Sequence, residues 1–344
     1  MQGQEALEQE IKVKSSVGID VCKSWLDAHV LPAGMSMRVP NTAAGIRTLK
    51  RRLAPFEVGL VAVEATGKWH RLLCRSLHAS GLAVAVVDPL RVRLFAKAHG
   101  ILAKTDRLDA GVLALFAAVM APPARPPAPT AMEELKELVG ARESAVAEEI
   151  MLNNQLAAAE GKFLKRQLAR RIARIGQDIK ALEGEIQKRI RADGELARRY
   201  TILVSIPGFG PVVASTLITR LAELGACTAK QIGSLAGLAP LANESGQHKG
   251  VRVIGGGRPS VRHVLYLAAV TAARCNADLK AFYERHLAAN KPAKVVLTAI
   301  ARKLAVLANT LIAQDRPSPS LTHNTDAPRF AGRGLQRITP ISRR

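Results

Sequence analysis

Residues 16–22, Ser-Val-Gly-Ile-Asp-Val-Cys, form an apolar segment that carries a single carboxylate, Asp20. Such a run predicts a buried strand, and similar runs predict strands over 26–31, 37–40, 58–65 and 82–87. Caps and apolar residues at helical spacing predict helices over 46–53, 69–79, 90–99 and 106–120. Three strands followed by alternating helices and strands predict an α/β domain over residues 15–120.

Residues 121–199 separate this domain from the rest of the chain. Residues 121–130 hold five of the 18 prolines, which predicts an extended linker. From Leu164 to Ile190, apolar residues recur in steps of four and three, as in the seam of a coiled coil. One or two long helices are therefore expected over 131–199. They would pair with each other or with a second subunit, and the second case predicts a homo-oligomer, a dimer or a tetramer.

The last part of the chain predicts a mostly helical domain over residues 200–315. Apolar periodicity places its helices near 210–222, 230–237, 259–275, 278–288 and 293–313. Residues 316–344 are rich in Pro, Ser, Thr and Arg, and a basic disordered tail is expected there.

Charge is the unusual feature of the composition. The 344 residues include 50 Lys and Arg against 28 Asp and Glu, a formal net charge of +22. Residues 200–344 carry 19 basic and 6 acidic residues, so most of the excess lies in this last part of the chain. Such a surface attracts polyanions, and nucleic acid is the first candidate partner. An aromatic content of 3% argues against base stacking as the main mode of binding.

Composition also excludes several other classes of protein. A hydrophobic share of 48% excludes wholesale disorder. No apolar run is expected to approach the roughly 18 residues of a membrane span, so no membrane partner is predicted. The four cysteines show no CxxC pairing, which argues against a disulfide framework or a cysteine zinc site. A reducing cytoplasm fits this cysteine usage.

Four carboxylates stand where a metal ion could use them. Asp20 lies inside a buried strand, where an unpaired charge is costly, and Glu64 ends the strand over 58–65. Asp106 and Asp109 begin a helix three residues apart, so both lie on one helix face. Carboxylate oxygens suit Mg²⁺ or Mn²⁺, which stabilise charge on a phosphate in transfer. Taken singly, the acids also fit a helix N-cap, a first helical turn and a turn; together they favour a metal site.

Three motifs carry a resemblance to a known family. Residues 18–21 (Gly-Ile-Asp-Val), 63–67 (Val-Glu-Ala-Thr-Gly) and 104–110 (Lys-Thr-Asp-Arg-Leu-Asp-Ala) resemble the DEDD signature of one group of insertion-sequence transposases. This is the IS-one-ten/IS-eleven-eleven group, relatives of the Piv DNA invertase. The resemblance implies a first domain similar to the RuvC Holliday-junction resolvase, and the predicted meander before the alternation is also the strand order of the ribonuclease-H-like fold. It further implies a catalytic Mg²⁺ held by the four acids.

A glycine turn precedes the first helix of the second domain. Residues 205–211 read Ser-Ile-Pro-Gly-Phe-Gly-Pro and resemble a helix-hairpin-helix turn. Gly208 and Gly210 would let the backbone approach a DNA phosphate, which the free N–H groups of the next helix can bind. An ordinary glycine turn is the alternative.

A polar, glycine-rich and basic stretch follows at 237–262. From Lys249 to Lys303 there are eleven basic residues and two acidic ones. We expect a flexible basic loop that holds a DNA backbone through Lys249, Arg252, Arg258 and Arg262. A solvated loop without a ligand is the alternative.

The same stretch resembles the family's C-terminal domain, in which a serine followed by a glycine is the nucleophile. Ser245 takes that position, whereas Ser234 and Ser260 are more simply read as structural. His248 could assist as a base, although a lone loop histidine is more often incidental, and Glu244 is unfavourable beside a phosphate. A serine hydroxyl needs activation. Metal held by the acids is a plausible activator, which requires the two domains, or two subunits, to meet.

The expected function is an insertion-sequence transposase or recombinase. Ser245 would attack double-stranded DNA at the ends of the element and at the target. The attack would form a phosphoserine, with Mg²⁺ held by the four acids. The resemblance also implies guidance by a structured noncoding RNA. The alternatives are a Piv-like site-specific invertase, a Holliday-junction resolvase that uses the acids for hydrolysis, and a non-catalytic nucleic-acid-binding protein, against which the presence of all four acids argues.

Overall fold

The computed structural model describes residues 14–65, 67–101, 106–241, 244–245, 248–249 and 253–318, with the backbone alone for 106–108, 244–245 and 248–249. Of the predicted tail, residues 319–344 lie outside this part of the chain. The structure divides into two compact units between Pro129 and Thr130, at the end of the proline-rich segment.

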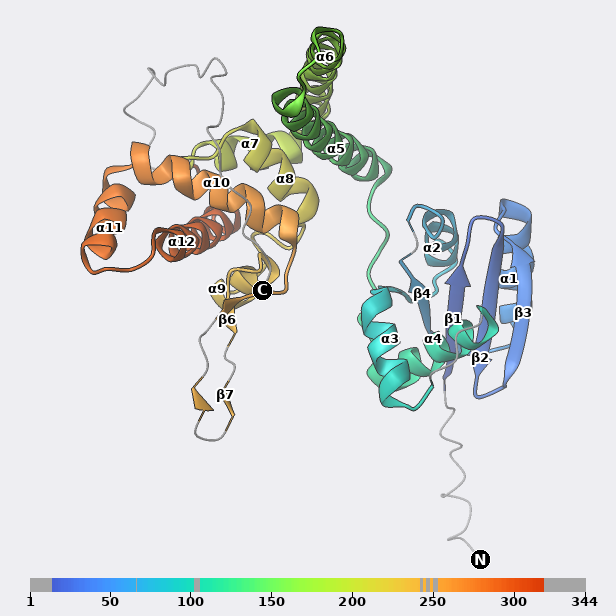
Figure 1. Cartoon of the computed structure of the whole chain (residues 1–344). Helices are drawn as coiled ribbons and strands as arrows, with labels where there is room; N and C mark the ends of the chain where they lie inside the picture. Colours follow the sequence, from blue (N-terminus) through green and yellow to red (C-terminus); the bar gives the residue numbers. More distant parts are fainter. Residues whose placement is uncertain are drawn as a thin grey trace, which may run out of the picture. The chain divides into compact units, whose positions relative to one another are not determined.

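The first unit is built on a five-stranded mixed sheet, drawn in Figure 1. Its strands are β1 (Ser15–Val21), β2 (Trp25–Leu31), β3 (Met35–Pro40), β4 (Val58–Glu64) and β5 (Val84–Val87). The spatial order is β3-β2-β1-β4-β5. The first three strands pair antiparallel as a meander, while β4 pairs parallel with both β1 and β5. The predicted α/β order, a meander followed by alternation, is confirmed.

Four helices complete this unit: α1 (Ala43–Leu53), α2 (Arg71–His78), α3 (Pro89–Ala98) and α4 (Asp106–Met120). Successive strand residues point to opposite faces, so the sheet has two cores. Val17 and Ile19 pack with α1 and α2 on one face. On the other face, Ala62 packs with Leu113 and Phe116 of α4.

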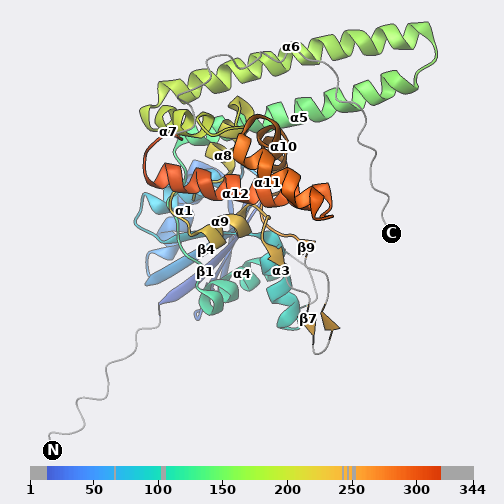
Figure 2. The ribbon, with the colours of Figure 1, turned by 90° about the vertical axis from the view of Figure 1, so that its left-hand side faces the viewer.

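The second unit begins with two long helices, α5 (Thr130–Ala158) and α6 (Lys162–Ala192), which lie side by side in Figures 1 and 2. Ion pairs fix an antiparallel arrangement: Arg142 contacts Glu183 at 2.7 Å, and Arg171 contacts Glu148 at 3.6 Å. Five residues of the predicted seam are buried within the chain: Leu168, Ile175, Ile179, Ile186 and Ile190. Of the two pairings expected from the sequence, the structure therefore shows the one between α5 and α6.

Six further helices form the body of the second unit: α7 (Gly194–Val204), α8 (Pro211–Arg220), α9 (Ala229–Leu235), α10 (Pro259–Cys275), α11 (Ala277–Ala288) and α12 (Ala293–Ala313). The predicted helical character of this part is confirmed. One expectation needs correction, because α12 is long and apolar enough to cross a membrane by length and composition alone. Its residues Ile300, Leu304 and Ala308 are buried in the core of the unit, as in the central helix of a globular domain.

The expected loop after α9 contains short strands instead. β6 (Pro240–Leu241) pairs antiparallel with β9 (Val253–Ile254), and β7 (Glu244–Ser245) pairs antiparallel with β8 (His248–Lys249). Both ladders belong to a stretch named here the serine arm (the described residues within 237–257). In Figure 1, β6 and β7 run away from α9 and the other helices of their unit. Strands of two residues give no periodic signal in a glycine-rich sequence, so the sequence predicts only a loop.

Candidate active site

Asp20 and Glu64 lie next to each other on the two central strands of the sheet. β1 and β4 run parallel, and Ile19 pairs with Val63, so the residues that follow are neighbours at the carboxyl ends of both strands. Two residues earlier, Gly18 pairs with Ala62, and Ala62 packs against α4. Because strand side chains alternate, Asp20 and Glu64 also project to the α4 face.

Gly18 brings α4 close to this pair of acids. A Cβ added at Gly18 would lie 2.2 Å from the carbonyl oxygen of Ala110 and 2.2 Å from the amide nitrogen of Ala114. Only glycine therefore allows the α4 backbone to rest directly on β1. This contact places the first turns of α4, and with them Asp109, on the same face of the sheet as Asp20.

The four predicted metal ligands thus come from three elements that meet on one sheet face. α4 begins at Asp106, whose side chain lies outside the described residues. Among the side chains that the structure describes, no group of three acids, histidines or cysteines lies close enough together to hold a metal ion. The arrangement gives the right donor chemistry and a shared face, and the ligation itself stays a prediction.

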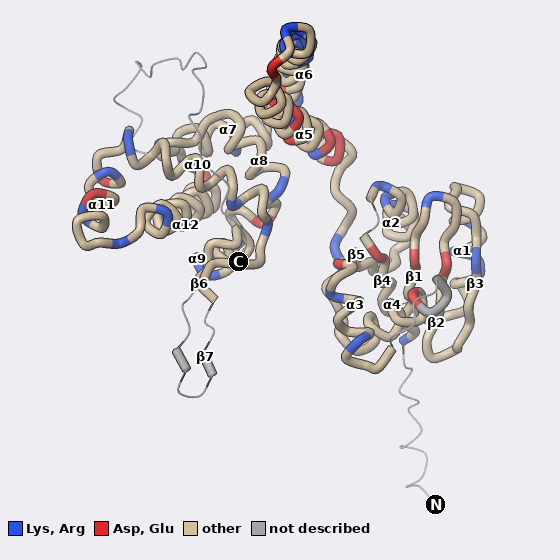
Figure 3. The backbone as a smooth tube through the Cα atoms, viewed as in Figure 1, with Lys and Arg blue, Asp and Glu red and all other residues tan. Residues whose placement is uncertain are grey.

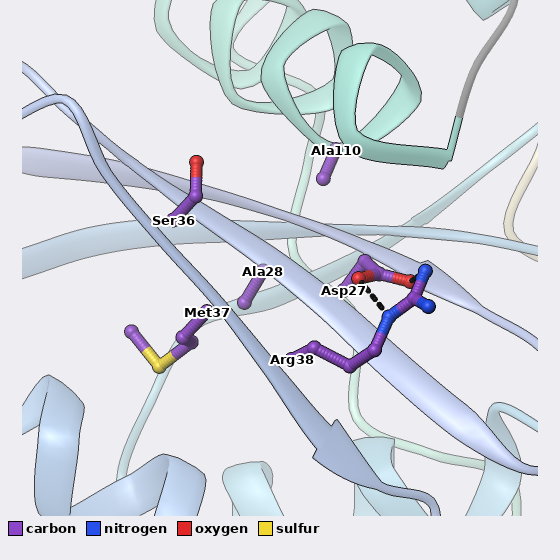
Figure 4. Close-up of a pocket in the computed structure, with 6 residues that line it drawn as sticks. All are labelled: Asp27, Ala28, Ser36, Met37, Arg38 and Ala110. Carbon is purple, nitrogen blue, oxygen red and sulfur yellow. Dashed lines mark hydrogen bonds and ion pairs between the residues drawn. The ribbon is translucent and has the colours of Figure 1, made fainter.

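Asp27, which the sequence argument missed, adds a further acid on β2, beside Asp20 of β1. Figure 3 shows acidic residues, coloured red, on neighbouring strands of this sheet. Asp27 lies on β2 and pairs directly with Asp20 of the antiparallel strand β1, so both residues face the same side of the sheet. Arg38 on β3 donates two hydrogen bonds to the Asp27 carboxylate, at 2.8 and 2.9 Å. The pair lines a pocket of about 370 Å³ with Ala28, Ser36, Met37 and Ala110 (Figure 4). The hairpin register between β1 and β2 is the signal that could have found Asp27.

The serine predicted as nucleophile lies on the serine arm. Ser245 is the second residue of β7 and pairs with His248 of β8, so its neighbour across the ladder is the histidine considered as a base. The side chains of both residues, and Arg252 altogether, lie outside the described part of the chain. Ser234 is a residue of α9, and Ser260 lies in the first turn of α10.

Two arginines predicted to bind DNA make contacts within the protein. Arg258 donates to both carboxylate oxygens of Glu223, at 2.7 and 2.8 Å. This bidentate hydrogen bonding, partly offset by burial, raises the pKa of the Arg258 guanidinium. Arg262 donates to the carbonyl oxygens of Gly237, at 3.3 Å, and Gly256, at 2.9 Å. Counting charge along the sequence does not reveal these partners.

The glycine turn between α7 and α8 has one crowded and one open position. Gly208 has φ +87°, and a Cβ there would lie 2.6 Å from the carbonyl oxygen of Ala268 on α10. Gly210 is the N-cap of α8, and an added Cβ would meet no atom within 4 Å. Packing against α10 accounts for Gly208, whereas Gly210 leaves the start of α8 open to a ligand.

Cations also gather where α11 meets α12. The Lys303 ammonium lies 4.5 Å from the centre of the Phe282 ring. Partial burial, together with the positive charges of Lys291, Arg285 and Lys303, holds the pKa of His286 below its ordinary value. The positive charges of these side chains favour phosphates near this surface.

Comparison with known families assigns the class of protein that these features define. Residues 17–159 match a transposase domain of the DEDD IS110 type, and residues 200–284 match the transposase IS116/IS110/IS902 family. The chain thus matches two domains of IS110-family transposases, and its class is that of the DNA transposases and recombinases.

The individual relatives are similar over nearly the whole chain. The pilin gene-inverting proteins of Moraxella bovis and Moraxella lacunata are each 27% identical over 321 residues, which are 90% of this chain and 99% of the relative. The likeness therefore includes both the sheet unit and the helical unit.

Proposed function

We propose that this protein cuts and rejoins double-stranded DNA through a phosphoserine formed on Ser245, with Asp20, Glu64, Asp106 and Asp109 as a metal site. The observation that carries the proposal is the placement of Asp20 and Glu64 on adjacent parallel strands, with the start of α4 on the same face. This placement supports a ribonuclease-H-like fold of the first unit. Carboxylates from three elements are the donor set that Mg²⁺ or Mn²⁺ prefers.

In the proposed reaction the Ser245 hydroxyl oxygen attacks a backbone phosphorus. The serine proton passes to water, a bond forms between the serine oxygen and phosphorus, and the bond to the deoxyribose oxygen breaks. That oxygen takes a proton from water and leaves as a hydroxyl. Rejoining reverses the step with a new deoxyribose hydroxyl, which releases the serine. A divalent ion on the acids would supply positive charge for the charge that develops on the phosphate.

DNA contacts are proposed for the serine arm and the turn before α8. Lys249 and Arg252 belong to the arm close in sequence to Ser245, and Gly210 opens the start of α8, where free N–H groups favour phosphate. The sequence also predicts phosphate contacts for Gly208, Arg258 and Arg262, whose side chains or backbone are engaged within the protein.

Four further proposals concern the cell compartment, the DNA sites, a guide and self-association. The protein would act in the bacterial cytoplasm on element ends and a target, with a noncoding RNA from the element as guide.

The protein would also self-associate through the α5–α6 hairpin. Beyond the buried seam, Ile150 and Phe163 are 57% and 68% exposed near the hairpin tip, which leaves apolar surface for a second copy. Replacing both with Ser should lower the sedimentation mass, whereas an unchanged mass would remove the tip from any interface.

Site-specific inversion is the second candidate function. It is favoured by the pilin gene-inverting relatives, which this chain matches over 99% of their length. A Holliday-junction resolvase would instead hydrolyse DNA without any covalent adduct. Sequencing the products separates inversion at one fixed pair of sites from insertion at a target.

The experiment that tests the nucleophile is a search for a covalent adduct. Purified protein is incubated with Mg²⁺, RNA transcribed from the DNA that flanks the gene, and labelled duplex from the same flanks, then separated by denaturing electrophoresis. Ser245→Ala should bind the duplex but form no adduct, while Ser234→Ala and Ser260→Ala are matched serine controls that should still form it. An adduct that persists in Ser245→Ala would overturn the assignment.

A further inference from the structure

The serine arm is joined to the helical body at a contact between two glycines. Gly237 and Gly257 stand where the chain enters and leaves the arm, with φ +66° and +61°. A Cβ added at Gly257 would lie 2.2 Å from the amide nitrogen and 2.5 Å from the Cα of Gly237. The two backbones therefore touch directly, and a side chain at Gly257 would force them apart.

Two arginines that follow the arm in the sequence hold this contact with hydrogen bonds. Arg262, on the first turn of α10, donates to Gly237 on the entering chain and to Gly256 on the leaving chain. The backbone N–H of Arg258 donates to the Leu235 carbonyl at 2.9 Å, at the end of α9. Both sides of the arm are thus tied to the same small part of the helical body.

The Arg258 side chain extends these hydrogen bonds to the end of α8. Besides Glu223, its guanidinium donates to the carbonyl oxygen of Arg220 at 2.9 Å. The guanidinium of Arg220 in turn pairs with Glu143 of α5 at 2.9 Å. Hydrogen bonds made by Arg258 and Arg220 therefore connect the root of the arm, where Gly237 meets Gly257, with α5.

We propose that Arg258, Glu223 and Arg262 are positioning residues, which hold the root of the serine arm and so set where Ser245 stands. The inference rests on the proposed role of Ser245 as the nucleophile. It differs from a phosphate contact, because the Arg258 guanidinium already has a bidentate carboxylate and a carbonyl as partners. Glu223 separates the two interpretations, since an acid cannot itself bind a phosphate.

The test compares Arg258→Gln and Glu223→Gln with Arg274→Gln, an exposed arginine at the far end of α10. Positioning predicts that both variants slow adduct formation by about 100-fold, the effect of a displacement near 1 Å. The double variant should be no slower than Arg258→Gln alone, because that variant already removes the bonds to Glu223 as well as the bond to the Arg220 carbonyl. Arg274→Gln should react at the normal rate.

Binding of a random-sequence duplex, measured against salt, tests the competing phosphate contact. Positioning predicts the same log–log slope for Arg258→Gln as for the unaltered protein. A phosphate contact at Arg258 would instead lower the slope by about 0.9, and Glu223→Gln would tighten binding by freeing the arginine. Either of those two results would overturn the proposal.

A readout that does not depend on Ser245 keeps the proposal separate from the nucleophile assignment. Amide hydrogen exchange of residues 237–257 should speed up in Arg258→Gln and in Glu223→Gln, with protection of α10 and α12 unchanged. Unchanged exchange in the arm would overturn the anchoring role even if the reaction slows. If Ser245→Ala still forms an adduct, the nucleophile assignment fails, and the exchange result still decides the anchoring of the arm.

Discussion

The sheet unit and the serine arm hold their proposed catalytic residues in different ways. Asp20 and Glu64 lie on β1 and β4, and each of these strands is bonded to a neighbour on both sides. Ser245 lies on a strand of two residues that pairs with β8, at the far part of an extension. The fold itself fixes the acids, whereas the place of the serine depends on a few contacts at the arm's root. Substitutions should therefore act differently in the two regions.

The largest effect is expected for the acids. Asp20→Asn and Glu64→Gln should remove all measurable strand cutting while thermal unfolding stays cooperative, because each keeps its shape but loses the negative charge that a metal ion needs. Asp27→Asn is the matched control, since it changes an acid on the same face of the sheet that already has Arg38 as its partner. Cutting of labelled duplex in Mg²⁺ measures the effect. If Asp27→Asn is equally inactive, the site includes more than the four acids.

Gly18→Ala tests whether the sheet alone fixes the acids. The added Cβ would overlap the α4 backbone at 2.2 Å, so the helix must move away from β1. We expect a loss of about 1–3 kcal/mol in the free energy of unfolding, as for other overpacked cores, with loss of cutting. Urea unfolding measures the first quantity. Gly111→Ala is the control, because its Cβ would meet only His29, at 4.0 Å.

Gly257→Ala should have a smaller and more local effect on the arm. Gly256→Ala is a close control, because both residues have φ near +60°, but only Gly257 is crowded. Left-handed strain costs each variant about 1–2 kcal/mol. We expect only Gly257→Ala to speed hydrogen exchange throughout residues 237–257 and to slow adduct formation. Equal behaviour of the two variants would contradict the glycine contact as the root of the arm.

The smallest effect is expected in DNA binding. Replacing Lys249 or Arg252 with Gln should lower the salt slope for duplex DNA by about 0.9 for each phosphate that the side chain no longer neutralises. Fluorescence anisotropy with a labelled random duplex gives this slope, and Lys280→Gln, on α11 and ion-paired with Glu284, is the control. Slopes that stay unchanged for Lys249 and Arg252 would remove the arm from the DNA surface.

The sequence predicts the two regions with unequal success, for physical reasons. Strands such as β1 and β4 are continuous apolar runs, and the helices have strong periodicity and caps, so their positions are confirmed to within a few residues. For the arm the sequence predicts a loop, because ladders of two residues depend on pairing across the hairpin and not on local propensity.

The same limit applies to single side chains. Asp20 stands out in the sequence because it interrupts an apolar run, whereas Asp27 becomes notable only when the register places it opposite Asp20. Charge density assigns Arg258 and Arg262 to DNA, but it contains no information about Glu223 or the Gly237 carbonyl. Partners that are distant in sequence are supplied by the fold.

The length of a ladder sets how far a reactive residue on it lies from the body of the protein. Each residue added to a strand lengthens it by about 3.3 Å and turns the following side chains to the opposite face. One residue pair inserted into the β6–β9 ladder would therefore move β7, which carries Ser245, outward and reverse the faces of the residues that follow, while two pairs would double the distance and restore the faces. An insertion that keeps the face on which Ser245 stands thus needs two residues on each side, and natural variation in the length of the arm should favour that step.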